Sequence, residues 1–379
     1  MSIEDEDVAS LLEEVGSFTQ RRVAASVMRP ETLLQPEALR QLTVEALELG
    51  ILPVSVDEVG FGLWEDCHQP HAMRFNIGVL RLVGHANPGV AFAWHRQALA
   101  RIFEREMGWK PAAETDAVLG VTMLLTGHYG LGRTSLARWL RGTAPEGDEQ
   151  DNLRDWLDRT AHFTTLTAPA SWDSLLWPVW HNDTITWERA SRISLNVRPC
   201  HAQHGLDELS TFQIVREKGD GEPCLLSPDS SRQLFARGLK MDMIGLLAIG
   251  AGAVTRAWGM AKDYAGFRQQ GGKLIGQHPA VQQMLCEVEL CRQSVERALQ
   301  ACERPVDRLD PGEIAAMRAS LSGLLCRAAS QVVQVFGGVG YMRDNGAEKI
   351  LRDMNMLKAQ TGGAWDLRSF IAGWCGDFA

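Results

Sequence analysis

The segment Gln331–Asp353, QVVQVFGGVGYMRDNGAEKILRD, is the feature that most limits how this chain folds. Apolar residues at helical spacing predict a helix that ends near Phe336, and Gly337, Gly338 and Gly340 follow it. Glycine makes tight turns at low conformational cost and lets another backbone or a flat ligand approach closely. A second helix is predicted to begin near Asn345, a residue able to cap it. The segment is therefore a tight helix-helix connection or a ligand-binding turn, and without a preceding strand it is not a βαβ nucleotide motif.

Hydrophobic periodicity divides the chain of 379 residues into three parts. Residues 1–117 and 229–379 repeat apolar residues at helical spacing, whereas residues 118–228 alternate apolar and polar residues as half-buried antiparallel strands do. We therefore predict an α+β fold with an N-terminal helical domain, a middle antiparallel β-barrel domain and a C-terminal four-helix bundle. The bundle helices are predicted near residues 239–268, 277–302, 312–336 and 346–359.

The alternation in the middle part is clearest at Ile193–Val197 and Thr211–Ile214. Four tryptophans are concentrated in the same part: Trp172, Trp177, Trp180 and Trp187. Large aromatic rings contribute much buried area to a core. We therefore predict that these four rings fill the interior of the small barrel.

Composition excludes several classes of protein. The formal charge of -9 argues against nucleic acid or an anionic membrane as the main partner. The N-terminus, MSIEDEDVAS, is acidic where a secretory signal would be basic, which predicts a cytoplasmic protein. The longest largely apolar run, Met243–Thr255, is too short to cross a bilayer, so we expect no membrane insertion. The eight cysteines lack C-x-x-C spacing and nearby histidines, which predicts reduced thiols and no metal site.

The glycine-rich segment also resembles the C-terminal signature of the acyl-CoA dehydrogenase superfamily, Q-x-x-G-G-x-G-Y-x-R-D-x-x-x-E-R-x-x-R-D. It departs only where Lys349 replaces an arginine and matches at Gln334, Gly337, Gly338, Gly340, Tyr341, Arg343, Asp344, Glu348, Arg352 and Asp353. The order of a helical domain, a β domain and a helical bundle is also that of the family, so the resemblance covers nearly the whole chain.

The resemblance implies an FAD flavoprotein that introduces an α,β double bond into an acyl-CoA or acyl-carrier thioester. The electrons would pass to an external acceptor such as an electron-transfer flavoprotein. Because the family binds FAD across a subunit boundary, the resemblance also implies a homodimer or homotetramer.

One group of cofactor positions carried over from the family lies in the bundle and serves the FAD of the neighbouring subunit. Arg268 matches the arginine that grips the FAD diphosphate, and Gln334, Gly337 and Gly338 match the segment that lies along the same cofactor. A guanidinium suits this role through charge-assisted, often bidentate hydrogen bonds to phosphate oxygens. Without the resemblance, Arg268 would be interpreted as a solvated surface charge.

A second group of positions lies in the β domain, where the family carries a T-E-P-x-x-G-S-D loop against the flavin. Thr126 keeps the hydroxyl of that loop, and Ser135 substitutes for its serine if the loop is longer. Phe163 and Thr165 match the family's (W/F)-(I/V)-T strand. The flavin-ring half of the site is therefore only partly kept, whereas the diphosphate half is better kept.

The glutamate that serves as the base in most of the family is absent, because Thr361 stands in its place. A minority of the family, similar to isovaleryl-CoA dehydrogenase, takes its glutamate from the first bundle helix in a G-L-D-x-E-R sequence. The matching segment here is G-L-K-M-D-M, which makes Asp242 the candidate catalytic base, and Met243 replaces an arginine of the CoA side. From the residues alone, Asp242 is also explained as an acidic residue that the N-terminal end of a helix dipole favours.

Two alternatives to this enzyme stay open. A chain that keeps the diphosphate half of a shared site but loses the usual base fits a non-catalytic subunit, paired in a hetero-oligomer with a homologous glutamate-bearing subunit. A flavin-dependent monooxygenase on the same scaffold would need no carboxylate at this place. The sequence does not rank these two alternatives.

Overall fold

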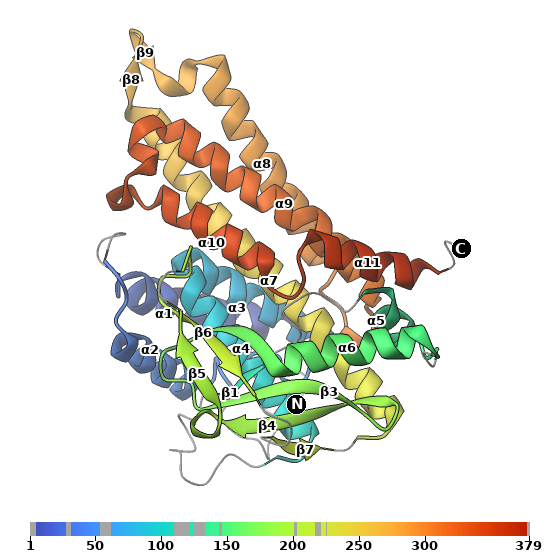
Figure 1. Ribbon diagram of the computed structural model, residues 1–379. Coiled ribbons are helices and arrows are strands. Elements are labelled where there is room, and N and C mark those ends of the chain that lie inside the picture. The colour runs from blue at the N-terminus through green and yellow to red at the C-terminus, as the bar shows by residue number, and fades with distance from the viewer. Residues whose placement is uncertain are drawn as a thin grey trace.

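The computed structural model describes residues 5–27, 32–53, 62–109, 122–124, 133–143, 146–200, 203–216, 221–224 and 226–376. Helices make up its N-terminal part: α1 (Asp5–Phe18), α2 (Pro36–Glu48), α3 (Pro70–Ala86) and α4 (Pro88–Glu106). The C-terminal part is also helical, and its bundle projects from the body of the molecule (Figure 1): α7 (Pro228–Phe267), α8 (Pro279–Gln300), α9 (Pro311–Phe336), α10 (Ala347–Ala359) and α11 (Ala364–Cys375). The four predicted bundle helices are therefore present, and α11 follows them.

Local sequence explains why many of these helices start where they do. Helices α2, α3, α4, α7, α8 and α9 have proline in their first turn, where the missing N–H costs no hydrogen bond. Side chains cap three of them: Asn87 caps α4, Ser227 caps α7 and Asp310 caps α9. Helix α10 differs from the prediction, because it begins at Ala347 and its N-cap is Gly346 rather than Asn345.

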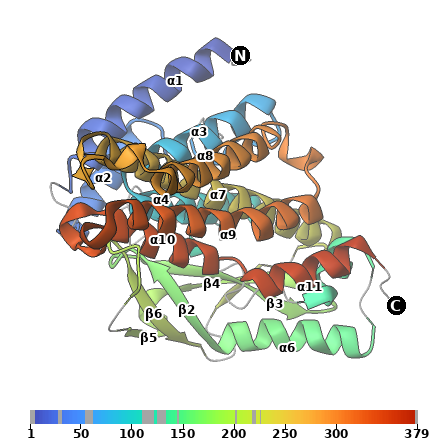
Figure 2. The same ribbon diagram turned by 90° about the horizontal axis from the view of Figure 1, so that it is seen from above.

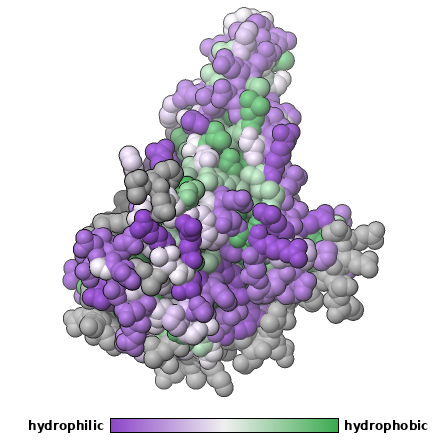
Figure 3. Space-filling model, turned by 90° about the vertical axis from the view of Figure 1, so that its right-hand side faces the viewer, coloured by the Kyte–Doolittle hydropathy of each residue, from purple (hydrophilic) through white to green (hydrophobic). Residues whose placement is uncertain are grey.

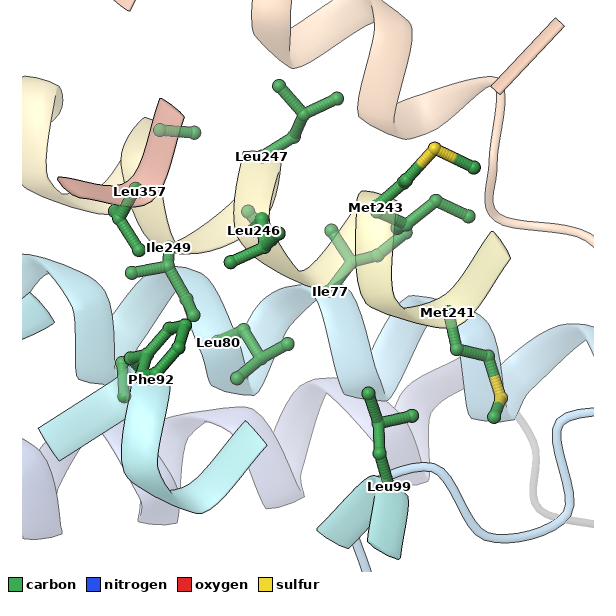
Figure 4. Close-up of a cluster of buried hydrophobic side chains, with 14 of the residues drawn as sticks. Ile77, Leu80, Phe92, Leu99, Met241, Met243, Leu246, Leu247, Ile249 and Leu357 are labelled. Carbon is green, nitrogen blue, oxygen red and sulfur yellow. The ribbon is translucent and has the colours of Figure 1, made fainter. Parts of the chain in front are cut away.

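Helix α7 is the centre of the molecule. It contacts α3 and α4 on one side and the bundle helices on the other, as seen from above in Figure 2. Its apolar residues pack with those of α3, α4 and α10, and Figure 4 shows this cluster, which includes Ile77, Leu80, Phe92, Leu246, Ile249 and Leu357. Helix α7 is long and apolar enough to cross a membrane, but 94% of its most apolar window is buried inside the protein, as expected of a central core helix.

Helices α3 and α7 cross in close contact through glycines. A Cβ atom added at Gly252 would lie 2.1 Å from the carbonyl oxygen of Arg81, and one added at Gly84 would lie 2.6 Å from the carbonyl oxygen of Ile249. No side-chain-bearing residue fits at such distances. The two glycines therefore fix how closely the N-terminal helices approach the bundle.

The middle part contains two helices, α5 (Arg133–Leu140) and α6 (Asp148–His162), and two separate sheets. One sheet has the order β1-β3-β4-β7, and its strands are β1 (Thr122–Leu124), β3 (Ser174–His181), β4 (Thr184–Ser191) and β7 (Glu222–Cys224). The other sheet is antiparallel, has the order β2-β6-β5, and consists of β2 (Phe163–Ala168), β5 (Asn196–Pro199) and β6 (Ser210–Val215). The strands described thus do not close into the predicted barrel.

Two further details of the middle part differ from the prediction. Thr211–Ile214 lies in β6 as predicted, but Ile193–Val197 is split between a 3-10 turn and the start of β5. Ile193 is 92% exposed, because it lies on that turn, outside both sheets. Helices α5 and α6 were not predicted, although Leu153, Trp156 and Leu157 on α6 have helical spacing.

The tryptophans are mostly core residues, but they belong to two cores. Trp172 and Trp177 lie in a small core of the middle part with Phe212. Trp187 lies in the main core, where its ring centroid is 4.6 Å from that of Phe103. Trp180 is only half-buried. The sheet β1-β3-β4-β7 therefore packs against the helical core through the face that carries Trp187.

The second half of the glycine-rich segment joins the bundle to the middle part. Arg352 on α10 donates to Asp207 at 2.7 Å, and Lys349 donates to both Glu208 and Asp353. A Cβ atom added at Gly205 would lie 2.5 Å from the carbonyl oxygen of Arg352, so the loop before β6 lies directly against α10. This segment therefore forms a turn and also fixes the position of the sheet β2-β6-β5 against α10.

We predict that Gly252→Ala destabilises the protein by about 1–3 kcal/mol, because the methyl group forces α3 and α7 apart. The matched control is Gly259→Ala on the same helix, where an added Cβ atom has no neighbour within 4 Å. The control should be neutral or more stable by up to about 1 kcal/mol, because alanine favours helix. Urea denaturation measures both, and equal midpoints for the two variants would contradict the close crossing.

Candidate active site

Asp242 lies in α7 with no exposed surface, facing α4 and the turn that follows α10. Leu246 and Ile249, at helical spacing from it, are buried on the same helix. A carboxylate in such a position is stable only when it is paired and hydrogen-bonded. Its partners therefore decide what chemistry is available here.

Three side chains bind the Asp242 carboxylate. His95 Nε2 lies 2.9 Å from Oδ1, Arg96 Nη1 lies 3.3 Å from Oδ2, and the Thr361 hydroxyl donates to Oδ2. Arg96 Nη2 also donates to the Thr361 hydroxyl oxygen at 2.7 Å. The two positions at which the family resemblance located a base, Asp242 and Thr361, are thus in direct contact.

Trp64 determines the state of His95. Its indole nitrogen Nε1 lies 2.9 Å from His95 Nδ1, and an indole N–H only donates. Nδ1 must therefore be the acceptor, which leaves the proton on Nε2 to be donated to Asp242. A Cβ atom added at Gly245 would lie 2.3 Å from His95 Cε1, so glycine is required for α7 to pass the ring. His95 is consequently a neutral, fixed donor rather than a free base.

The pKa values follow from burial and pairing. Burial would raise the pKa of Asp242, but Arg96, His95 and Thr361 outweigh it and lower the pKa to about 2. Burial also lowers the pKa of His95, against the opposing effect of Asp242. The site at neutral pH therefore consists of an anionic carboxylate, a neutral imidazole and a cationic guanidinium.

A second buried guanidinium lies close to this group. Arg318 on α9 is 1% exposed and donates through Nη2 to the carbonyl oxygen of Leu357, near the end of α10. Burial lowers its pKa to about 10, while the charge of Asp242 acts in the opposite direction. A cation suits the carbonyl end of a helix. Two buried cations, Arg96 and Arg318, thus share one buried anion.

The turn after α10 has an unusual backbone. Thr361 has φ 52° and Gly362 has φ 89°. A β-branched residue rarely adopts a left-handed conformation, which costs of order 1 kcal/mol or more. The hydrogen bonds of Thr361 to Asp242 and Arg96 offset that cost. Such local strain is typical of functional sites.

Asp242 was predicted from the sequence as the candidate base, and Thr361 was identified only as the replacement of the usual glutamate. Trp64, His95, Arg96 and Arg318 were missed. The available signal was the adjacent pair His95-Arg96 in a helix that is otherwise apolar around it, VAFAWHRQALA. A polar pair inside an apolar helix indicates a buried polar partner elsewhere. The identity of that partner was not readable from the sequence.

The predicted diphosphate residues lie together at the far end of the bundle. Arg268 is the exposed C-cap of α7. Near it, the end of α7 contacts the end of α9, because the ring centroids of Tyr264 and Phe336 lie 4.5 Å apart. Gln334 is exposed and donates to the Tyr341 hydroxyl at 2.8 Å. These residues therefore form one surface, which we call the bundle tip.

The glycines of the bundle tip leave open space. Gly337 has φ 62°, and Cβ atoms added at Gly337 or Gly338 would have no neighbour within 4 Å. Apolar side chains around the turn are exposed: Phe267, Val339, Tyr341 and Met342. Figure 3 shows hydrophobic atoms among hydrophilic ones along the projecting bundle. A guanidinium beside an open glycine turn fits a diphosphate, with the exposed rings beside it available to a flat ligand or a second chain.

The bundle tip and the Asp242 group are far apart within one chain. Arg268 follows Asp242 by 26 residues on the same helix, which corresponds to roughly 39 Å at about 1.5 Å per residue. One cofactor molecule does not reach both from a single chain. The two halves of the predicted site are therefore not joined in the monomer.

The flavin-ring positions lie on separate elements of the body. Ser135 is buried on α5, and Thr165 is half-buried on β2, where it pairs with Gln213 of β6. Phe163 is the first residue of β2, and Thr126 lies outside the described residues. Within the described part of the chain, no group of three or more His, Cys, Asp and Glu residues is arranged to hold a metal ion.

Comparison with known proteins gives a consistent result. The family described as acyl-CoA dehydrogenase, C-terminal domain, matches residues 233–372. The chain is 30% identical over 151 residues to the probable acyl-CoA dehydrogenase YngJ of Bacillus subtilis (strain 168), which is 38% of this chain and 39% of that protein. It is 26% identical over 132 residues to 3-sulfinopropanoyl-CoA desulfinase of Paraburkholderia xenovorans (strain LB400), which is 34% of each chain. The matched segments thus span well under half of these relatives.

Solved structures extend the similarity of fold to the whole chain. The crystal structure of the prolyl acyl carrier protein oxidase AnaB covers 99% of this chain and 100% of its own, with a TM-score of 0.72 and 14% identity. At this identity the likeness concerns the fold. It includes the N-terminal helices and the middle part, which the matched family segment does not reach.

We predict that the contribution of Asp242 to stability depends on pH in the acid range. Its pKa of about 2 in the folded protein is below the ordinary 3.8, so its pairing stabilises the protein fully above about pH 4 and is lost as the pH falls toward 2. The stability difference between wild type and Asp242→Asn should shrink by about 2 kcal/mol across this window.

Denaturant unfolding at a series of pH values measures this difference. The control is Asp263→Asn, on the exposed face of the same helix, which should change stability little. A stability difference between the wild type and the Asp242→Asn variant that stays constant from about pH 7 to about pH 2 would contradict the ionised, paired state of Asp242.

Proposed function

Because this chain is a divergent member of the acyl-CoA dehydrogenase family, we propose that it is an FAD-dependent oxidoreductase that forms an α,β double bond in an acyl thioester. The observation that carries the proposal is the contact between Asp242 and Thr361. Two alternative base positions of the family meet at one point of the fold. The chain keeps one carboxylate there, although the more common position has become a threonine.

In this proposal Asp242 accepts the α-proton of the substrate. FAD, when bound, supplies the acceptor for the hydride from the β-carbon, and an external protein then takes the electrons. Asp242 is ionised at neutral pH, as a base must be before the reaction. Arg96 and Thr361 both bind the Oδ2 atom, so substrate must displace at least one of them before that oxygen is available.

We infer that two copies of the chain share the cofactor. The bundle tip offers Arg268, Gln334, Gly337 and Gly338 for a diphosphate, but it lies roughly 39 Å from Asp242 along α7. A dimer in which the tip of one chain reaches the body of the other satisfies both halves. The exposed apolar residues of the tip support this arrangement, because a monomer seldom leaves such a surface uncovered.

The relatives and the solved structures support a thioester substrate carried either by CoA or by a carrier protein. The Bacillus relative is named as a probable acyl-CoA dehydrogenase, and the Paraburkholderia relative acts on a CoA thioester by its name. The AnaB oxidase acts, by its name, on a prolyl acyl carrier protein, so both carriers stay open in the proposal. Titration of the flavin with acyl-CoAs tests the CoA carrier.

One observation favours a second candidate, the non-catalytic subunit of a hetero-oligomer. Asp242 accepts from three donors and has a pKa of about 2, which makes it a weak proton acceptor. A carboxylate held in this way also serves purely as an anchor for Arg96. This candidate expects a homologous, glutamate-bearing chain as partner.

We predict that Arg268→Met lowers FAD affinity by about 10–100-fold, because it removes charge-assisted hydrogen bonds to the diphosphate. The visible absorbance of purified protein and fluorescence titration with FAD measure this loss. The control is Arg297→Met, an exposed arginine on α8, which should bind FAD like the wild type. Equal FAD affinity in both variants would remove Arg268 from the cofactor site.

We predict that acyl-CoA bleaches the flavin absorbance of the wild type under anaerobic conditions, and that Asp242→Asn slows this by about 100-fold or more, because the amide cannot accept the α-proton. Acyl-CoAs of graded length are titrated against both proteins, with Asp263→Asn as the control. An unchanged rate in Asp242→Asn would exclude Asp242 as the base. Failure of the wild type to bleach, together with copurification of a homologous chain, would instead support the non-catalytic subunit.

A further inference from the structure

The buried charges around Asp242 do not balance. Arg96 and Arg318 are both buried guanidiniums, 5% and 1% exposed. The negative charge of Asp242 acts on both of them and opposes the effect of burial on their pKa values. Arg96 already forms an ion pair with Asp242 at 3.3 Å. Among the described residues of this group, the charge of Arg318 is therefore the one left without an anion of its own.

Hydrogen bonding at Arg318 is also incomplete. Its Nη2 donates to the carbonyl oxygen of Leu357, whereas its Nε is buried and has no hydrogen-bond partner among the described residues. An unmet guanidinium donor in a core is costly, although the Nε atoms of Arg232 and Arg237 also lack a hydrogen-bond partner among the described residues. An additional, negatively charged acceptor at this place would neutralise the Arg318 guanidinium and accept a hydrogen bond from its Nε.

The position of Arg318 relates this acceptor to the proposed site. Arg318 holds the end of α10 at Leu357, and Thr361 lies one turn further along the chain, in contact with Asp242. A molecule bound beside Asp242 would thus lie near the positive charges of Arg96 on α4 and Arg318 on α9. Because the pKa of Arg318 stays near 10, its guanidinium is charged at neutral pH.

We propose that the substrate is an acyl thioester whose acyl chain ends in an oxyanion, such as a carboxylate, which Arg318 binds together with Arg96. This inference rests on the proposed function, because it locates the acyl chain beside Asp242. Planar guanidiniums bind carboxylates in a bidentate manner. A neutral, aliphatic acyl chain would leave the Arg318 charge buried and uncompensated, whereas an anionic chain end compensates it.

The test compares two unreactive ligands, S-(4-carboxybutyl)-CoA and S-pentyl-CoA. They have the same number of acyl-side carbons and differ in having a carboxylate or a methyl group at the end. Neither contains a thioester carbonyl, so neither can be dehydrogenated, and binding is measured independently of catalysis. Isothermal titration of the FAD-loaded protein should show at least about tenfold tighter binding of the carboxylate ligand.

Variants then assign the preference to Arg318. In Arg318→Met the affinity ratio should fall to near one, while Arg318→Lys should keep part of it because the charge stays. Arg327→Met, an exposed arginine on the same helix, should keep the wild-type ratio. Melting temperatures show which variants are folded, and the wild-type comparison stands even if Arg318→Met does not fold.

Equal affinities of the wild type for the two ligands, or binding of neither, would overturn this inference. A wild-type ratio that Arg318→Met and Arg318→Lys leave unchanged would overturn it as well. Failure of the proposed dehydrogenation appears in a different measurement, the bleaching of the flavin by acyl-CoA. A retained preference for the carboxylate ligand without bleaching would therefore separate the two ideas, since it supports the anionic ligand and contradicts the reaction.

Discussion

A carboxylate with no access to water determines how the N-terminal helices meet the C-terminal helices. Leaving Asp242 unpaired in the core would cost several kcal/mol, so the fold must bring it donors. They come from α4, through His95 and Arg96, and from the turn after α10, through Thr361. The interaction therefore fixes the N-terminal helices, the central helix and the end of the bundle relative to one another.

The length of α7 imposes a second constraint, which concerns function more than stability. One continuous helix of 40 residues carries Asp242 in its buried half and ends at Arg268 on the exposed bundle tip. A rigid helix cannot bring its own two ends to the same ligand. In the proposed dimer a second copy supplies the missing half, so that one ligand would contact both groups.

The helices were predictable because their signals are local. Proline at the first position and apolar residues every three or four positions depend only on neighbours in sequence, and the bundle helices appear within a few residues of the prediction, apart from an earlier start for α7. The sheets were less predictable. Ile193 alternates with polar neighbours as a strand residue would, yet it lies on a 3-10 turn and is almost fully exposed. Alternation cannot reveal which strands pair, so the closed barrel was wrong.

The candidate site shows the same division between local and long-range information. Asp242 and Thr361 were found because each sits in a segment that resembles a family motif, but their contact joins residues 119 positions apart, and the contact of His95 with Asp242 spans 147. The residues near His95 in the sequence do not identify Asp242 as its partner. Each buried polar group needs a hydrogen-bond partner. The polar pair His95-Arg96 in one apolar helix and the acidic Asp242 in another are therefore best assigned to each other.

The same rule explains why Arg318 carries more information than its sequence context does. Asp242, Arg96, His95 and Thr361 bind one another, so a structural anchor accounts for their contacts. Arg318 is not explained in that way, because one carboxylate does not neutralise two buried guanidiniums and Arg96 is already paired with it. A core built only for stability would replace such a charge with an apolar side chain. Its retention beside the candidate base is therefore better explained by a ligand than by the fold.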